Sequence, residues 1–172
     1  MQDSFFDLVY NLDAYVLGSA MLEATSKIVQ AESPDVQLFT LLLNCLKVMA
    51  YEKAEPTAVC IKYLMELLKL SGFGFNLSRC AVCEKSLSNE TSVGFVYEGS
   101  GVVCAHDKSR VDNMNLTSSE WGILKNISNI SVDLLHGLKF SSRESLTDCL
   151  KLILKQYYFR TGEKLKCLES YF

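Results

Sequence analysis

The sequence predicts a mainly α fold, a helical bundle interrupted by a small β-hairpin insert at about residues 76–110. Three observations lead to this fold class. Apolar residues recur at helical spacing through most of the 172 residues and make up 49% of the chain. Between the helical stretches lies a glycine-rich, β-leaning region, and it carries three of the seven cysteines. The length suits one domain, divided into helical residues 3–72, an insert over residues 73–112 and helical residues 116–165.

Two helices are expected first. Over residues 3–29, apolar side chains recur at helical intervals, which predicts one amphipathic helix. Residues 35–50 are apolar on nearly every side, so we expect a central helix that its neighbours enclose. Ser33 and Pro34 are predicted to form its start, because serine caps a helix and proline fits the first helical position.

A third helix and a hairpin follow. Glu55 and Pro56 open the helix, and Gly72 is well placed to end it in the left-handed conformation. Residues 93–97 are β-branched and aromatic, and the glycine-rich residues 98–101 form a plausible hairpin turn. This change from Leu-rich helical segments to glycine-rich, β-favouring residues marks the insert.

Helices resume after the insert. Thr117 with Glu120, and Ser141 with Glu144, both fit the capping box, in which each side chain satisfies an otherwise unpaired backbone N–H. The last helix is predicted over residues 142–159. Its expected inward positions are Leu146, Cys149, Leu150, Ile153 and Tyr157.

Composition and charge narrow the function classes. The net charge of −3 gives no general attraction to nucleic acid, so any contact with DNA must come from a local patch. No apolar run reaches the roughly 18–20 residues of a membrane span. Residues 1–10 lack the basic start and cleavage site of a secretory signal. Seven cysteines without an export signal indicate reduced thiols and a metal site, so we expect a cytoplasmic protein with no membrane association.

The cysteines of the insert have metal-site spacing. Cys80 and Cys83 form a Cys-x2-Cys pair, and Cys104 follows after a spacer typical of zinc sites. A structural Zn²⁺ would stabilise an insert too small to build much of a core. The sequence leaves the fourth ligand open. His106 is the better zinc ligand but lies one residue short of the position that a second cysteine would occupy, and Asp107 lies at that position but offers a harder oxygen. A water molecule is the third choice. The alternative is a turn without bound metal, in which the three cysteines act as small hydrophobic residues.

No catalytic constellation is evident. The sequence has neither a GxxxxGK[ST] phosphate loop nor a GxSxG nucleophile elbow. Cys80 and Cys83 could form a redox dithiol, but that motif normally lies at a helix N-terminus in an α/β fold, and here it follows a glycine loop. The other cysteines are interpreted as core or incidental thiols: Cys45, Cys60, Cys149 and Cys167. We therefore expect a protein that is not an enzyme.

Basic and aromatic residues gather near the end of the chain. Positive charge between aromatic rings suits single-stranded nucleic acid, through phosphate neutralisation and base stacking. The candidate contacts are Lys151, Lys155, Tyr158, Arg160, Lys164 and Lys166. The alternatives are a solvated helix face, whose cations stabilise the helix C-terminus, and a surface for a protein partner.

Several segments, in order, resemble the C-terminal part of the bacterial recombination mediator RecO. They are the Leu-rich residues 38–46, the glycine- and aromatic-rich residues 70–83 that lead to the Cys-x2-Cys pair, and residues 101–104, which end at Cys104. Residues 140–143 and 157–167, in the final helix and tail, complete the set. The resemblance spans nearly the whole chain. Where the family generally has a second Cys-x2-Cys pair, this chain has Cys104-x2-Asp107.

The resemblance implies a non-catalytic DNA repair protein. RecO proteins bind single-stranded DNA, anneal complementary strands, contact single-strand-binding protein and, with RecR, load the RecA recombinase during gap repair. They begin with an oligonucleotide/oligosaccharide-binding (OB) barrel, which supplies much of the DNA binding. Nothing in this sequence matches that barrel, so we expect either an isolated C-terminal domain or a shortened relative.

The resemblance further implies docking of RecR or of the tail of single-strand-binding protein by the helical body, a structural metal, and a place at the nucleoid during repair. The alternative function is an independent zinc-knuckle module that binds single-stranded nucleic acid. A thiol oxidoreductase is a third class.

Overall fold

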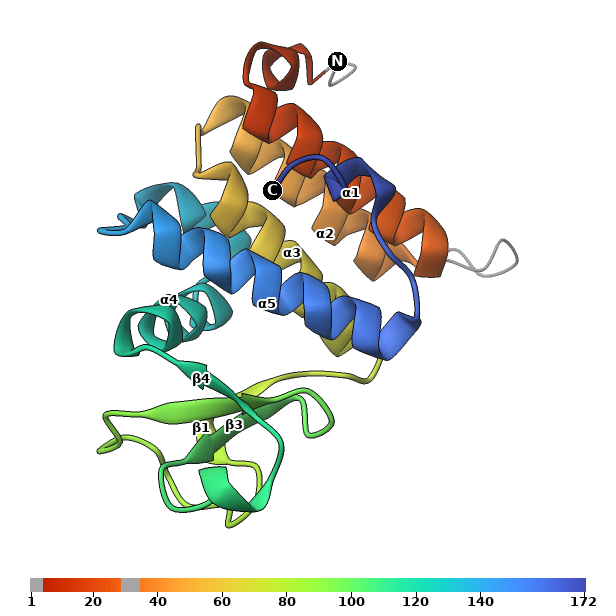
Figure 1. The fold of residues 1–172 in the computed structure, drawn as a ribbon. Coiled ribbons are helices and arrows are strands. Elements are labelled where there is room, and N and C mark those ends of the chain that lie inside the picture. The colour runs from red at the N-terminus through yellow and green to blue at the C-terminus, as the bar shows by residue number, and fades with distance from the viewer. Residues whose placement is uncertain (1–4, 29–34) are drawn as a thin grey trace.

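The computed structural model describes residues 5–28 and 35–172. Along the chain the elements are η1 (Phe6–Tyr10), α1 (Leu12–Ile28), α2 (Val36–Tyr51), α3 (Pro56–Leu70), β1 (Asn76–Cys80), β2 (Val93–Val96), β3 (Gly101–Cys104), η2 (Lys108–Arg110), β4 (Met114–Leu116), α4 (Ser118–Asn129), η3 (Val132–Gly137), α5 (Arg143–Thr161) and η4 (Lys166–Leu168). The helices form one body, and the sheet lies beyond α4 at one end of it (Figure 1). The predicted fold class is confirmed: a mainly helical chain with the cysteine cluster in a small β insert.

The central helix of the bundle is α3. Twelve of its fifteen residues are buried, and it packs against α1, α2, α4 and α5. Its one buried cation, Lys62, donates to Glu66 Oε1 at 2.8 Å and to the Ser128 carbonyl at 3.0 Å. The prediction of a central helix over residues 35–50 was wrong, because neighbours do not enclose α2, which leaves Val36 73% and Phe39 64% exposed.

The ends of α3 are as predicted. Pro56 occupies the first helical turn, where its missing N–H needs no partner. Gly72 has a φ of +87°, in the left-handed region. The N–H of Gly72 donates to the Lys69 carbonyl at 3.0 Å, and that of Phe73 to the Leu68 carbonyl at 2.7 Å. These two bonds form a Schellman motif, which closes the helix and turns the chain toward the sheet.

The first helix is not continuous as predicted. It is divided into η1 and α1 at Asn11, whose backbone is extended and whose Oδ1 accepts the N–H of Ala14 at 3.1 Å. This side chain competes with helical backbone pairing and begins a new helix. Val9 and Leu12, two of the apolar residues that recur through the predicted span, are 61% and 75% exposed. Residues 3, 4 and 29 of the predicted span lie outside the described residues.

The start of α2 differs from the predicted cap. Asp35 is the N-cap, and its Oδ1 accepts the N–H groups of Gln37 at 2.9 Å and Leu38 at 3.0 Å. Ser33 and Pro34, predicted to form this start, lie outside the described residues. The helix itself begins and ends within one residue of the predicted range.

The capping boxes were predicted correctly at one helix and wrongly at the other. Thr117 and Glu120 form the complete reciprocal box at the start of α4. The N-cap of α5 is Ser142, whose Oγ accepts the N–H of Ser145 at 3.1 Å, and not Ser141. Both serines suit a cap chemically, so the sequence alone could not choose between them. The five inward positions predicted for the last helix are all buried.

The insert is a four-stranded mixed sheet in the order β1-β3-β2-β4. Strands β2 and β3 form the predicted hairpin, with Val93 opposite Cys104 and Val96 opposite Gly101. Strand β1 pairs parallel to β3, and β4 pairs antiparallel to β2. Neither outer strand was predicted, because β1 is mostly polar and β4 has three residues. The sheet therefore extends to Leu116, past the expected end of the insert.

Polar contacts fix the sheet to the bundle. The indole Nε1 of Trp121 donates to the Leu77 carbonyl at 3.0 Å. On α5, Gln156 Nε2 donates to the Tyr97 carbonyl at 3.1 Å, and Arg160 Nη2 to the same carbonyl at 2.9 Å. Both side chains also donate to the hydroxyl of Ser100, at 3.0 Å and 2.7 Å. We call this pair of residues the Gln156–Arg160 clasp.

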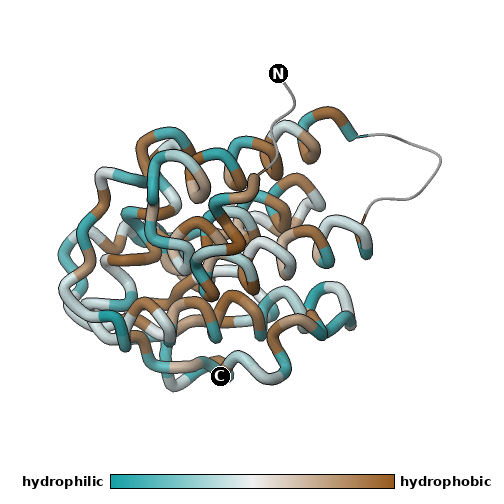
Figure 2. Tube along the Cα trace, turned by 90° about the horizontal axis from the view of Figure 1, so that it is seen from above, coloured by the Kyte–Doolittle hydropathy of each residue, from teal (hydrophilic) through white to brown (hydrophobic). Residues whose placement is uncertain are grey.

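Hydrophobic and hydrophilic residues alternate along the helices of the bundle (Figure 2).

Cys45, Cys60 and Cys149 are buried thiols, as predicted, while Cys167 is exposed. None of the helices in the described ranges has the length and apolar character that a membrane span requires.

Candidate metal centre and bundle-end cleft

Two matching turns bring the candidate ligands together. Cys80 ends β1 and Cys104 ends β3, and these strands lie side by side in parallel. Each strand is followed by a tight turn that carries the chain back over its own end, so that Cys83 and Asp107 meet the first two cysteines. The N–H of Glu84 donates to the Cys80 carbonyl at 2.9 Å and that of Asp107 to the Cys104 carbonyl at 3.1 Å. The pairing of β1 with β3 thus builds the site.

The four donor atoms form a compact cluster. The sulfurs of Cys80, Cys83 and Cys104 and a carboxylate oxygen of Asp107 all lie within 4.8 Å of one another. Asp107 Oδ2 is 3.3 Å from Cys80 Sγ and 3.2 Å from Cys104 Sγ, and the Cys83 and Cys104 sulfurs are 4.0 Å apart. Three of the four residues are buried, and Cys83 is exposed. The cluster is close enough to hold one metal ion.

The electrostatics of the cluster favour charge on Cys80 and Asp107. Burial raises the pKa of the Cys80 thiol, but the backbone N–H groups of Cys83, Cys104 and Val82 outweigh it and lower that pKa below its ordinary value. Hydrogen bonds from the Cys83 and Cys104 thiols hold the pKa of Asp107 well below its usual range. Because the Cys83 thiol is a donor to Asp107, its own pKa is raised to about 12.

Asp107, and not His106, lies with the sulfurs. The Asp107 side chain is fully buried, whereas the His106 ring is 75% exposed. The His106 Nδ1 is 3.2 Å from Asp107 Oδ1, and Arg110 Nη1 donates to that same oxygen at 3.1 Å. One carboxylate oxygen is therefore held by Arg110 and His106, and the other faces the thiols. Sequence reasoning missed Arg110; its position three residues after Asp107, in one turn of η2, was the available signal.

The predicted nucleic-acid contacts do not form one free surface. Arg160 belongs to the clasp, and its guanidinium bonds to the β2–β3 turn. The Nζ of Lys155 lies 4.8 Å from the Tyr97 ring centre, and that of Lys164 lies 5.6 Å from the Tyr158 ring centre. The remaining two differ: Lys151 pairs with Asp148 at 3.6 Å, and Lys166 is exposed on η4.

A cleft opens at the end of the bundle far from the sheet. Its volume is about 810 Å³, and its walls come from η1, the α2–α3 connection and the η3–α5 connection. The apolar part of the lining includes Met49, Ala54, Pro56, Leu138, Phe140 and Leu146. The charged part comprises Asp7, Lys53, Glu55, His136, Lys139 and Arg143. Sequence reasoning missed this cleft, because its residues come from separate segments and share no motif.

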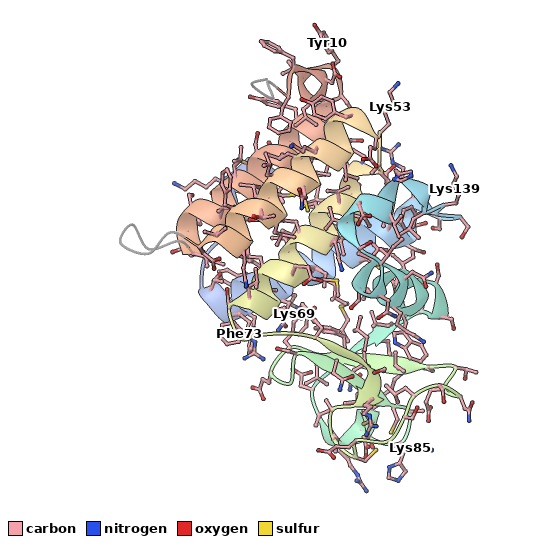
Figure 3. The ribbon with its side chains drawn as sticks, turned by 180° about the vertical axis from the view of Figure 1, so that it is seen from behind. Tyr10, Lys53, Lys69, Phe73, Lys85 and Lys139 are labelled. Atoms are coloured by element: carbon pink, nitrogen blue, oxygen red, sulfur yellow. The ribbon has the colours of Figure 1, made fainter. Side chains whose placement is uncertain are left out.

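Two cations of the cleft are unpaired. Arg143 is bound to Asp13 at 2.7 Å, and His136 lies 2.9 Å from Glu52. Lys53 and Lys139 make no ion pair or hydrogen bond with the described part of the chain. Both extend from the same end of the molecule, opposite the end that carries Lys85 (Figure 3).

Comparison with known proteins shows the family of this chain. Residues 9–169 match the family described as "Recombination protein O C terminal". The chain belongs to the RecO family. Among curated relatives named DNA repair protein RecO, that of Caldicellulosiruptor saccharolyticus is 33% identical over 110 residues, which cover 64% of this chain and 44% of the relative. Those of Clostridium kluyveri and Desulforamulus reducens are 25% and 27% identical over 98% of this chain and 65% of each relative.

Family membership confirms the resemblance and supports a role in DNA repair. The chain spans 44% to 65% of the length of these three relatives. The relatives are named as DNA repair proteins, and none of these names states a catalytic reaction.

Proposed function

We propose that this domain is a non-catalytic docking module of RecO-type DNA repair, which binds the tail of single-strand-binding protein and RecR. The observation that carries the proposal is the bundle-end cleft, with its apolar floor and two unpaired lysines. Through these contacts the domain would support binding and annealing of single-stranded DNA and loading of the recombinase at the nucleoid.

The chemistry of the cleft suits an acidic peptide with an apolar end. An apolar residue would occupy the floor between Met49 and Leu138, where water is displaced from hydrophobic surface. Carboxylates of the same peptide would then meet Lys53 and Lys139 at the rim, and such rim charges steer association and fix orientation. Asp7 and Glu55, also in the lining, would repel an acidic residue placed on their side, which restricts the peptide to one direction.

A peptide-binding measurement tests the docking role. Fluorescence anisotropy of a labelled peptide, the C-terminal tail of single-strand-binding protein, is measured against the full chain. We expect saturable binding that Lys53→Glu and Lys139→Glu each weaken about tenfold, the effect of removing one close charge pair and adding a repulsion. Lys85→Glu, at the opposite end of the molecule, is the matched control and should leave the affinity unchanged. No binding, or an equal effect of Lys85→Glu, would contradict the proposal.

We also propose that the cysteine cluster holds a structural Zn²⁺. The donors are three soft sulfurs and one carboxylate oxygen, a set that zinc accepts in tetrahedral geometry. One oxygen of the Asp107 carboxylate accepts from Arg110, and the other faces the thiols, where a Zn²⁺ would bind it together with the sulfurs. Four protein ligands leave no open position for chemistry, so the ion would stabilise the turns.

Metal analysis of the purified chain tests this assignment. We expect one zinc per chain, lost in Cys83→Ser and in Asp107→Ala and kept in His106→Ala. Loss of zinc in His106→Ala with retention in Asp107→Ala would assign the fourth ligand to the histidine instead.

The alternative function is an independent zinc-knuckle module that binds single-stranded nucleic acid. The exposed rings of Tyr158 and Phe159, near Lys155 and Lys164, favour it. It requires measurable affinity of this chain alone for an oligonucleotide, falling steeply with salt. Docking remains the leading proposal, because Arg160 is occupied by the clasp and the net charge is −3.

A further inference from the structure

One thiol of the cysteine cluster is open to solvent, and the other two are not. Cys83 is exposed, whereas Cys80 is 1% and Cys104 3% exposed. Cys83 lies in the segment after β1, where residues 81–86 are all exposed. Lys85, in the same exposed segment, lies at the end of the molecule away from the bundle (Figure 3). A small reagent in solution therefore meets the cluster first at the Cys83 sulfur.

The two buried sulfurs of the cluster differ in their contacts. The Cys80 Sγ accepts the N–H of Val82 at 3.5 Å and that of Cys104 at 3.4 Å, so it is tied to the backbone of its own turn and of β3. The Cys104 Sγ lies 4.0 Å from the Cys83 Sγ. Cys104 is itself fixed in the hairpin, where it pairs with Val93. The exposed sulfur is therefore a neighbour of a buried sulfur that a paired strand holds in place.

A disulfide between Cys83 and Cys104 requires only a local movement. The bond is about 2 Å long, so the two sulfurs must approach each other by about 2 Å. Residues 81–86 are at the surface, and the first buried residue after them is Leu87. This exposed segment can therefore bring the Cys83 sulfur inward while β3 and the core stay in place.

We propose that Cys83 and Cys104 form an oxidation site, where a hydroperoxide joins the two sulfurs in a disulfide and the cluster releases its metal. The inference rests on the proposed Zn²⁺ site and is independent of peptide binding in the cleft. A thiol that coordinates a metal is deprotonated, and the thiolate is the form that attacks an oxidant. As a ligand, the exposed Cys83 is thus both reachable and nucleophilic.

The oxidation proceeds in two steps. The Cys83 thiolate attacks one oxygen of hydrogen peroxide, the O–O bond breaks, and Cys83 becomes a sulfenic acid, while the released hydroxide takes a proton from solvent and leaves as water. The Cys104 thiolate then attacks the sulfenic sulfur, so that the S–S bond forms and the S–O bond breaks. The hydroxide released in this step also takes a proton from solvent. In sum, the two thiolates lose two electrons, and the peroxide is reduced to two water molecules.

Asp107 makes the oxidation decisive for the metal. With Cys83 and Cys104 joined, the donors left are one sulfur, on Cys80, and the Asp107 carboxylate. A structural zinc site has four protein ligands, and a carboxylate oxygen is a harder donor than a sulfur. The two remaining donors therefore do not retain Zn²⁺. A thiol reductant restores the two cysteines by exchange, so the change is reversible.

Treatment of the purified chain with hydrogen peroxide tests the proposal. Cys167→Ser is introduced first, because Cys167 is an exposed thiol outside the cluster and would also react. A colorimetric zinc indicator follows the release of metal, and mass spectrometry of unreduced peptides identifies the disulfide. We expect one zinc ion released for each Cys83–Cys104 disulfide, and rebinding after dithiothreitol and zinc are added. The same chain incubated without peroxide is the control and should keep its zinc.

Two further readouts show which thiols react. Dimedone, which traps sulfenic acids, should label Cys83 and leave Cys80 unlabelled, because only the first is exposed. The buried thiols of Cys45, Cys60 and Cys149 lie outside the cluster and should stay reduced at the same peroxide concentration. Equal oxidation of these thiols would mean that peroxide unfolds the chain, and it would overturn the assignment of a selective site.

Zinc content before oxidation separates two kinds of failure. A chain that holds no zinc before peroxide is added contradicts the metal site, and metal release with it. Zinc that stays bound after peroxide contradicts the oxidation site alone. A disulfide between Cys80 and Cys83, or oxidation of Cys83 to a sulfinic acid without a disulfide, would also overturn the proposed pair.

Discussion

The helical bundle and the cysteine-bearing sheet are stabilised by different means. The bundle is organised around α3, whose Val59, Ile61, Leu64 and Leu67 are fully buried and packed on every side by other helices. The sheet has short strands of three to five residues whose buried apolar side chains, among them Phe95 and Val102, join the same core, and its far end carries the cluster of three thiols and one carboxylate. The bundle thus depends on apolar burial, which is spread over many residues, whereas the far end of the sheet depends in addition on a few specific contacts at the cluster.

The difference indicates which side-chain losses each region of the domain can tolerate. Loss of one apolar side chain removes a fraction of the bundle's stabilisation, because the rest of the core persists. Loss of one ligand removes the metal site as a whole, because the remaining donors no longer form a complete coordination shell. The two regions should therefore respond to different perturbations.

The largest effect is expected on removal of the proposed Zn²⁺. Binding of structural zinc contributes roughly 10–16 kcal/mol in zinc-finger peptides, so a chelator or Cys104→Ser should unfold the turns of the sheet and leave the bundle folded. Amide exchange should rise by orders of magnitude in β1 and β3, while the helical circular dichroism changes little. Cys167→Ser, at an exposed thiol outside the cluster, is the control and should behave as the unchanged chain.

A chelator that left the exchange of β1 and β3 unchanged would show that hydrogen bonds and apolar contacts suffice for the sheet. A chelator that unfolded the whole chain would show that the bundle also requires the metal. Either result would remove the proposed distinction between the two regions.

The next largest effect is expected from a cavity in α3. Leu64→Ala should lower the free energy of unfolding by about 2–5 kcal/mol, because it removes a fully buried side chain from the centre of the bundle. Denaturant unfolding followed by helical circular dichroism measures this loss. Zinc content should stay at its full value. Leu134→Ala, at a half-exposed position, should cost far less, and an equal cost would contradict the central place of α3.

Sequence patterns predicted these two regions unequally. Helix type and most helix limits followed from periodicity and from residues such as Pro56, Gly72 and Thr117, whose preferences act locally. The choice of α3 over α2 as the central helix did not follow, because both are strongly apolar and only the tertiary arrangement decides which one is enclosed. The outer strands were missed, because a short polar strand forms only when a neighbour supplies the pairing.

The candidate site shows the same limit. The three cysteines were evident from spacing, since a Cys-x2-Cys turn is a local feature. The choice between His106 and Asp107 was not, because it depends on how the turn after β3 returns over the parallel strand β1. The cleft could not be predicted at all, since its lysines lie 86 positions apart at Lys53 and Lys139 and meet only in the folded chain.

A smaller effect is expected at the junction of the two regions. Arg160→Ala should weaken the attachment of the sheet by about 1–3 kcal/mol, because the guanidinium donates to a carbonyl and a hydroxyl of the β2–β3 turn. Exchange of the Ser100 amide should rise while β1 and α3 stay protected. Lys155→Ala, five residues earlier on α5 at a side chain that contacts the Tyr97 ring, is the matched control. Equal exchange of the Ser100 amide in both variants would show that the Gln156–Arg160 clasp does not stabilise the attachment of the sheet.

The smallest effect is local and concerns the C-terminal tail, which attaches to the bundle without metal. Burial favours protonation of Glu23, but the N–H groups of Cys167 and Lys166, each 3.0 Å from a carboxylate oxygen, outweigh it and lower the pKa from 4.5 to about 2. A lowered pKa means that the ionised group stabilises the folded attachment above pH 4.5, and that this contribution is lost as the pH falls toward 2. The amide signals of Lys166 and Cys167 in NMR spectra should therefore shift toward those of a free tail across this range. In Glu23→Gln the tail should be attached more weakly than in the unchanged chain above pH 4.5 and show no such transition; the same transition in that variant would assign it to another group. A chelator should not move this transition, because a carboxylate holds the tail, whereas the proposed Zn²⁺ lies in the sheet.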